Sequence, residues 1–339
     1  MSSSVTGHDH AAGMNRLTNV VAVIGLLPIL LVVMVALLVI FEPRFLGIFN
    51  VFNVLRSASF LAILAAGQML VLIVGGFDLS VGAVIALAST VMAKVMAALM
   101  QTMPDQVGLV ILLGVMAGIA CGVGIGMING LCVAFLRISP FMVTLGTLSI
   151  ASGIALLLTN GIPVYGMPDE FVKGFGRALW FGLPTTVYVA LALIVLVWII
   201  QNHTVLGRYI YAIGGNLQAA LVSGVATKTY LVTAYTLCGA LAAITGVLLT
   251  ARLGSGQATL GGNIMMLQSI AAAVIAGVSL RGGIGRVEMV ALGALFLSIV
   301  TNAMNLLRID SKIQTIVLGV IVILAVALDE LGRRRQIRE

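Results

Sequence analysis

Charged side chains are scarce in this sequence: Asp, Glu, Lys and Arg make up only 9% of its 339 residues, whereas 61% are hydrophobic. A soluble globular domain carries about 25% charged residues, so the shortage excludes a water-soluble fold. Cysteine is scarce too. Cys121, Cys132 and Cys238 lie within apolar runs and form no Cys-x-x-Cys pair, so neither a disulfide framework nor a metal site is indicated.

Catalytic motifs are also missing. The sequence contains no Gly-x-x-x-x-Gly-Lys-Ser/Thr phosphate loop, so the chain does not hydrolyse ATP by that route. His203 is the only histidine outside residues 1–18, and neither a Ser-His-Asp nor a His-Glu-x-x-His arrangement can be assembled. The sequence therefore argues against an enzyme.

Acidic residues are missing from the middle of the apolar runs. Asp78 lies between two runs, where a helix cap is the favoured interpretation and contact with substrate or a gate is the alternative. Ion-coupled carriers keep charged groups inside the membrane for their work. A transporter subunit that is driven by a separate protein fits these absences better than an ion-coupled carrier does.

What the sequence has in abundance is long apolar runs. About 20 apolar residues are enough for a helix to cross a bilayer, and continuous runs indicate helices rather than a membrane barrel. We therefore expect an all-α polytopic protein with about ten transmembrane helices. The runs cover residues 20–41, 57–74, 81–99, 107–136, 140–160, 184–201, 229–250, 265–280, 287–307 and 313–328.

The distribution of basic residues predicts the orientation. Residues 1–18 form a polar, disordered cytoplasmic tail, 19–330 a single transmembrane domain, and 331–339 a basic cytoplasmic tail. With both ends cytoplasmic, more Lys and Arg fall inside than outside, as in bacterial inner-membrane proteins. The net charge of +7 is thus assigned to anchoring at the membrane surface, and no nucleic-acid partner is expected.

The segment 202–228 lies between two apolar runs and is too polar for the membrane interior. We expect short helices that are broken at Gly214–Gly215 and that a partner ATPase grips, so that the loop passes mechanical work to the membrane helices. The candidate coupling residues are Gly207, Arg208, Tyr211, Gly214, Gly215, Asn216, Gln218, Ala219, Ala220 and Gly224.

Two further sets of residues lie within the apolar runs. Glycines at a spacing of four let helix backbones approach closely, which predicts packing against a neighbouring helix or a second protomer at Gly114, Gly118, Gly122, Gly126 and Gly130. Neutral amides and hydroxyls can bind sugar hydroxyls without a buried charge, or can simply bond a neighbouring helix. The candidate substrate path is Gln68, Asn129, Thr144, Asn302 and Asn305.

Several motifs together resemble one family over about residues 40–330. They are Gly-Gly-Phe-Asp-Leu-Ser-Val-Gly at 75–82, Asn-Gly at 129–130, Ser-Pro-Phe-Met-Val-Thr-Leu-Gly at 139–146, Leu-Gly-Arg-Tyr-Ile-Tyr-Ala-Ile-Gly-Gly-Asn at 206–216, Gly-Gly-Ile-Gly at 282–285 and Asn-Ala-Met-Asn-Leu-Leu at 302–307. In these motifs the chain resembles the permease subunit of binding-protein-dependent ABC importers of the ribose/xylose/arabinose class. The related branched-chain amino-acid permeases are the alternative, and the 206–216 motif favours sugars.

The resemblance implies a fold like that of the vitamin B12-type importer, with alternating access between two permease protomers. It also implies a cytoplasmic ABC ATPase, which would bind ATP and magnesium, and an extracytoplasmic sugar-binding protein. It places the family's coupling motif on segment 202–228. Leu217 and Leu221 stand where the family usually has a glutamate and an arginine, so we expect this segment to dock through apolar shape.

Overall fold

The computed structural model describes residues 26–336, so the predicted tail at 1–18 lies outside the described residues. The chain divides between residues 51 and 52 into two compact units. The first holds helix α2 (Leu26–Phe41), the 3₁₀ helix η1 (Pro43–Leu46) and the start of α3 (Ile48–Ile73). Within it, the Arg44 guanidinium forms an exposed ion pair with Glu42 at 2.7 Å.

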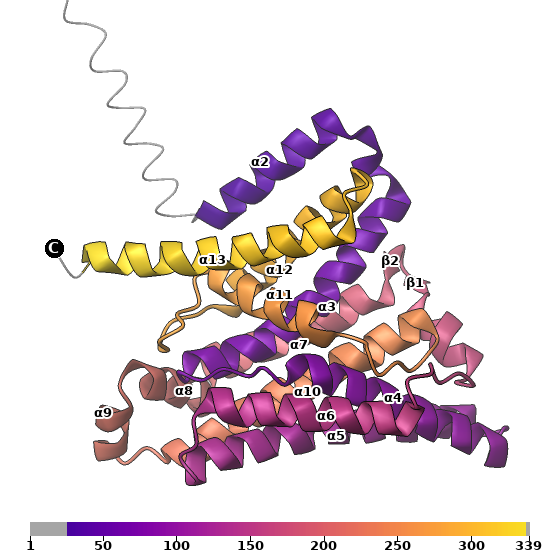
Figure 1. Cartoon of the computed structure of the whole chain (residues 1–339), viewed down its shortest axis with the longest axis horizontal. Helices are drawn as coiled ribbons and strands as arrows, with labels where there is room; N and C mark the ends of the chain where they lie inside the picture. Colours follow the sequence, from indigo (N-terminus) through magenta and orange to yellow (C-terminus); the bar gives the residue numbers. More distant parts are fainter. Residues whose placement is uncertain (1–25, 337–339) are drawn as a thin grey trace, which may run out of the picture. The chain divides into compact units, whose positions relative to one another are not determined.

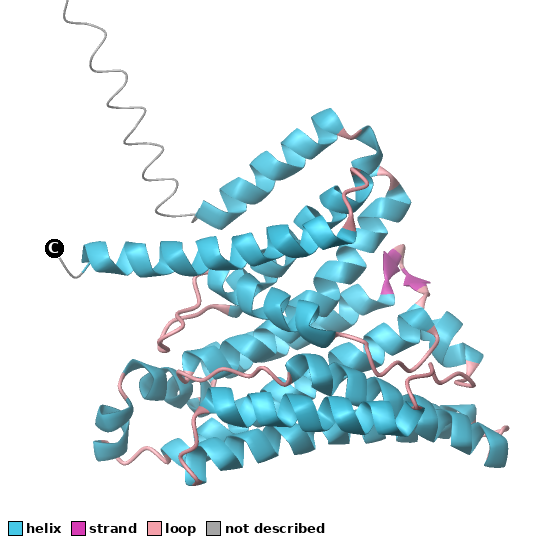
Figure 2. Cartoon of the chain, in the orientation of Figure 1, coloured by secondary structure: helices cyan, strands magenta, loops and turns pink. Residues whose placement is uncertain are grey.

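The second unit is mostly helical, as the sequence predicts (Figures 1 and 2). Between α6 and α7 the described residues contain one π-helix, η2 (Glu170–Gly176), and one hairpin of two-residue strands, β1 (Leu179–Trp180) and β2 (Leu183–Pro184). The remaining α-helices are α4 (Val81–Thr102), α5 (Val107–Phe135), α6 (Pro140–Thr159), α7 (Thr185–His203), α8 (Val205–Gly215), α9 (Leu217–Val222), α10 (Thr227–Leu253), α11 (Gly262–Ile275), α12 (Val287–Leu306) and α13 (Ser311–Gln336).

Seven of the described helices, α3–α7, α10 and α12, are long and apolar enough to cross a membrane. Three shorter apolar helices span Leu27–Phe41, Gly262–Ile275 and Ser311–Leu324. The multi-pass architecture is therefore confirmed, while the count of ten transmembrane helices stays a prediction. The largest differences from the apolar runs are at three ends: α3 begins nine residues before 57, α11 ends five residues before 280, and α13 continues through Arg333–Arg335.

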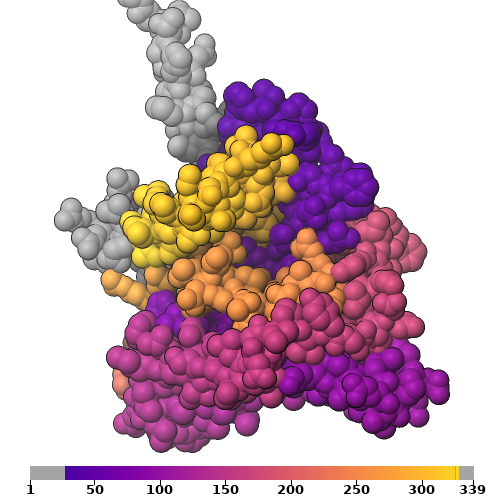
Figure 3. Space-filling model, turned by 45° about the vertical axis from the view of Figure 1, so that its right-hand side comes forward, coloured from indigo at the N-terminus to yellow at the C-terminus, as the bar shows by residue number. Residues whose placement is uncertain are grey.

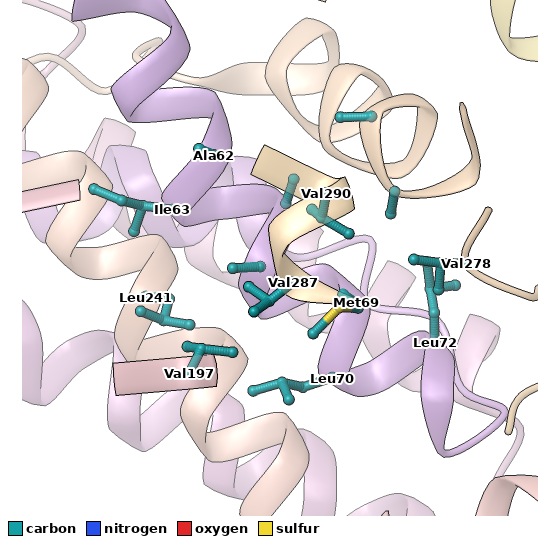
Figure 4. Packing of buried hydrophobic residues seen from close by; sticks show 14 of the residues in the cluster. Ala62, Ile63, Met69, Leu70, Leu72, Val197, Leu241, Val278, Val287 and Val290 are labelled. Atoms are coloured by element: carbon teal, nitrogen blue, oxygen red, sulfur yellow. The ribbon is translucent and has the colours of Figure 1, made fainter. Parts of the chain in front are cut away.

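Helix α3 is the central helix of the core. About 89% of its candidate span is buried, compared with 22% of the span of α5. Met69 and Leu72 of α3 belong to one cluster with Val197 of α7, Leu241 of α10 and Val287 of α12 (Figure 4). Burial of this kind, at about 25 cal/mol per Å² of apolar surface, fixes the end of α3 against the start of α12.

Residues 254–261 form an irregular stretch of turns and bends against α4. Its backbone pairs with Val164 at Gly256, and the Gln257 N–H donates to the Ser89 hydroxyl of α4 at 3.1 Å. Next along the stretch, Gly262 touches Gly82 near the start of α4. Irregular backbone is tolerated at membrane depth only where protein covers it, and α11 begins from this covered stretch. Figure 3 shows α13 (yellow) packed over the orange segment that contains α11.

Candidate functional site

The segment 202–228 folds into two short helices, α8 and α9. The Thr204 hydroxyl caps α8 by accepting the Gly207 N–H at 3.2 Å, and Asn216 Oδ1 caps α9 by accepting the Ala219 N–H at 2.9 Å. The prediction of short helices is thus confirmed, and α8 ends at Gly215, the second residue of the predicted break. Both glycines lie inside α8, and the chain breaks at Asn216, because its side chain satisfies a free N–H group of the next helix.

Gly214 allows α8 to touch two other segments. A Cβ at this position would overlap the Ile73 carbonyl at the end of α3 and the Gly283 N–H, whereas a Cβ at Gly215 would meet nothing within 4 Å. The Gly283 N–H donates to the Ile73 carbonyl at 2.9 Å. The end of α3, the 282–286 loop and α8 are therefore packed backbone to backbone.

Side chains strengthen this junction. The Tyr211 hydroxyl of α8 and the Gln201 amide of α7 both donate to the Gly285 carbonyl, and Gln201 Oε1 accepts the Val287 N–H at 3.1 Å. Burial, reinforced by nearby Glu288, raises the pKa of Tyr211 to about 12. Its hydroxyl therefore remains a donor at neutral pH. These bonds tie α8 and α7 to the loop before α12 and to its first residue.

The outer surface of the segment is apolar where α9 faces away from the core. Leu217, Leu221 and Val222 are exposed, the last to 90%, while Ala220 packs inward. Of the other predicted coupling residues, Arg208, Gln218 and Ala219 are exposed. Gly224 adopts a positive φ of 79° in the turn after α9.

A cleft of about 610 Å³ lies beside α9, between the ends of α3, α5 and α10. Its rim contains Arg137, Gln218 and Lys228, and its walls include Leu217 and Leu221. The Lys228 ammonium lies 4.9 Å from the centre of the Phe135 ring. This end of the second unit therefore offers an apolar helix with cationic neighbours.

The glycine stripe of α5 packs inside the chain. Gly114 and Gly118 touch Met96 and Ala88 of α4. Further along, Gly122 abuts the Gly239 carbonyl of α10, and the last two glycines of the stripe, Gly126 and Gly130, abut the backbone around Tyr235 and Val232 of the same helix. The stripe drifts around the helix, as expected for a spacing of four, so its first two glycines pack against α4 and its last three against α10.

The five candidate path residues have different surroundings. Gln68, Asn129 and Thr144 are wholly buried, and the Thr144 hydroxyl bonds Pro140 O in its own helix at 2.8 Å. Asn305 Oδ1 accepts from Gln314 of α13 at 2.9 Å, and Asn302 also has a partner. None of these residues lines one of the four cavities described in the second unit.

Asp78 is the residue whose role the sequence understated. It is 1% exposed, and its Oδ1 accepts the Ser80 N–H at 2.9 Å and the Ser80 hydroxyl at 2.6 Å. Asn129 of α5 donates to that hydroxyl at 2.9 Å, and Cys238, midway along α10, lies beside the carboxyl. Asp78 therefore belongs to a polar group enclosed by membrane helices. It does not cap α4 directly, which corrects the favoured interpretation.

The fold defines a class: a multi-pass helical membrane protein, here with two short helices, α8 and α9, between the long helices α7 and α10. Residues 50–326 match the family model described as the branched-chain amino acid transport system permease component. The chain belongs to this family of transport permeases.

Curated relatives are similar along almost their whole length. The ribose import permease protein of Escherichia coli (strain K12) is 38% identical over 307 residues, 89% of this chain and 92% of the relative. The ribose import permease protein of Bacillus subtilis (strain 168) is 36% identical over 300 residues, 88% and 90%. The galactose/methyl galactoside import permease protein of E. coli (strain K12) is 34% identical over 317 residues, 91% and 94%. No solved structure matches the chain.

Proposed function

We propose that this chain is the membrane-spanning subunit of an ATP-driven importer for a monosaccharide or a related polyol. The observation that carries the proposal is the similarity, over about nine-tenths of both chains, to permeases named for ribose and galactose import. The family description names branched-chain amino acids instead, so that substrate class is the alternative to test.

The partners follow from the same proposal. A cytoplasmic ABC ATPase binds ATP and magnesium and docks on α8–α9, an extracytoplasmic protein delivers the sugar, and two permease protomers alternate access between them. The fold is that of the vitamin B12-type importers, and both chain ends and α8–α9 face the cytoplasm of a bacterial inner membrane. The apolar exposed surface of α9 and the basic rim around it support this docking.

The substrate class is tested by uptake into vesicles that contain this permease and its ATPase, supplied with the binding protein. Radiolabelled ribose, allose, galactose and leucine are the probes. We expect ATP-dependent uptake of at least one sugar and none of leucine. Uptake of leucine alone would assign the branched-chain alternative, and sugar uptake without ATP would contradict an ATP-driven importer.

A further inference from the structure

A cavity of about 200 Å³ lies where α3, α10, α11 and α12 meet in the second unit. Its polar lining consists of Ser57, Arg252, Gln268, Ser298 and Thr301, and its largest apolar neighbour is the Phe60 ring. The four helices place hydroxyl, amide and guanidinium groups around one space that apolar side chains also line.

Three of these polar side chains are unpartnered. No hydrogen bond between residues 26–336 reaches the side chains of Ser57, Gln268 or Ser298. Of the three, Ser57 is exposed and Gln268 is half-buried, whereas Ser298 is only 5% exposed. A buried polar group without a partner is costly, by about 1–3 kcal/mol, and such groups are rare unless they serve water or a ligand. The buried and unpartnered Ser298 hydroxyl, which lines the same cavity as Ser57 and Gln268, is therefore the group that points to a binding site.

The lining also selects the chemistry of the ligand. Hydroxyls and an amide both donate and accept hydrogen bonds, which suits a ligand rich in hydroxyl groups. The one charged group is Arg252, which lies 5.7 Å from the Phe60 ring centre and 3.4 Å from Asn53 Oδ1. No carboxylate lines the cavity, so the ammonium of an amino acid would have no ionic partner. At about 30 Å³ per water molecule, the cavity has room for one small ring.

A second cavity continues the polar lining toward α13. It measures about 270 Å³ and shares Gln268 and Thr301 with the first, and α13 adds Ser311, Gln314 and Thr315. Gln268 and Thr301 therefore line both cavities, and a ligand that moved from one cavity to the other would pass them.

We propose that the cavity between α3, α10, α11 and α12 is a subsite that binds a neutral polyhydroxylated substrate during transport, with Gln268, Ser298 and Thr301 as its specificity residues. The proposal rests on the proposed function and deepens it. It adds three residues that line one cavity to the predicted substrate path, which stays a prediction.

The first test changes the lining in the reconstituted complex. Gln268→Leu and Ser298→Ala each remove one hydrogen-bonding group, and we expect labelled ribose, allose or galactose uptake, measured at saturating loaded binding protein, to fall about three- to tenfold. Ser269→Ala is the matched control, because Ser269 is a buried neighbour on α11 whose hydroxyl donates to Met266 O at 2.7 Å and lies outside the cavity. Wild-type rates in both lining variants would overturn the proposal.

A second test does not depend on transport rates. In a variant without the three native cysteines, Ser298→Cys should react with a small water-soluble thiol reagent, and the transported sugar should slow that reaction while leucine does not. Ser269→Cys should not react. Equal labelling of Ser298→Cys with and without sugar would rule out the subsite, whereas sugar uptake by the wild-type complex would still uphold the proposed function.

Discussion

At the scale of single residues, the carboxyl of Asp78 has an unusual environment. Its Oδ1 holds two hydrogen bonds from Ser80, its Oδ2 has no partner among the described residues, and no basic side chain pairs with it there. A buried charge without a cation is expensive. The sequence showed an acid between two apolar runs, but its depth depends on how α5 and α10 close over residues 76–80, which no local pattern encodes.

We therefore expect Asp78 to act as an uncharged hydrogen-bonding group that positions the start of α4. Asp78→Asn keeps an oxygen for both Ser80 bonds, so sugar uptake should stay within about twofold of wild type. Asp78→Ala leaves buried donors unsatisfied, at about 1–3 kcal/mol, so thermal stability and uptake should both fall. The exposed Asp105 is the control position for both substitutions. If Asp78→Asn were as damaging as Asp78→Ala, a charged carboxylate would be required instead.

At the scale of helices, the sequence predicted the elements better than their partners. The apolar runs gave each long helix within a few residues at most ends, and the spacing of four predicted that α5 packs closely. The glycines divide between α4 and α10 because the stripe drifts around the helix. The cap at Asn216 was missed because a glycine pair is a stronger breaker in sequence than an asparagine.

Close packing of α5 predicts a sharp difference between two of its glycines. A Cβ at Gly122 would overlap the Gly239 carbonyl, whereas one at Gly124 would meet nothing within 4 Å. We expect Gly122→Ala to lower the thermal stability of the purified complex, since α5 and α10 must separate, and Gly124→Ala to be neutral or slightly stabilising. Gly122→Leu should have a larger effect than Gly122→Ala. Equal stability of the two alanine variants would contradict this packing.

The backbone contacts of α8 predict that two further glycine substitutions have different effects. Gly214→Ala should push α8 away from Ile73 and Gly283, and so reduce the sugar transported per ATP hydrolysed. Gly215→Ala should leave this ratio unchanged, because a Cβ at Gly215 meets nothing within 4 Å. The ratio is measured from uptake and phosphate release in the same vesicles. A loss at Gly215 with none at Gly214 would be the opposite of what the contacts imply.

At the scale of the whole molecule, composition alone indicated a membrane protein, because charged residues make up 9% of the sequence and a water-soluble domain has about 25%. The substrate site was not predictable in the same way. Ser57, Gln268 and Ser298 are distant in sequence and have no shared motif, so only the packing of α3, α11 and α12 brings them to one cavity. The irregular stretch before α11 was not predictable either, because its backbone pairs with Ser89 of α4 and with Val164, which are distant in the sequence.

We propose that ATP hydrolysis drives transport through docking of the ATPase on α9. The β1–β2 hairpin precedes α7 and α8 follows it, and α7 is about 28 Å long at 1.5 Å per residue. The exposed Val222 of α9 and the fully exposed Phe181 of the hairpin therefore mark the two ends. The most direct test places a photo-crosslinking residue at each position in membranes that contain the assembled importer. We predict crosslinks to the ATPase from Val222 and none from Phe181. ATPase crosslinks from Phe181 and not from Val222 would contradict the account.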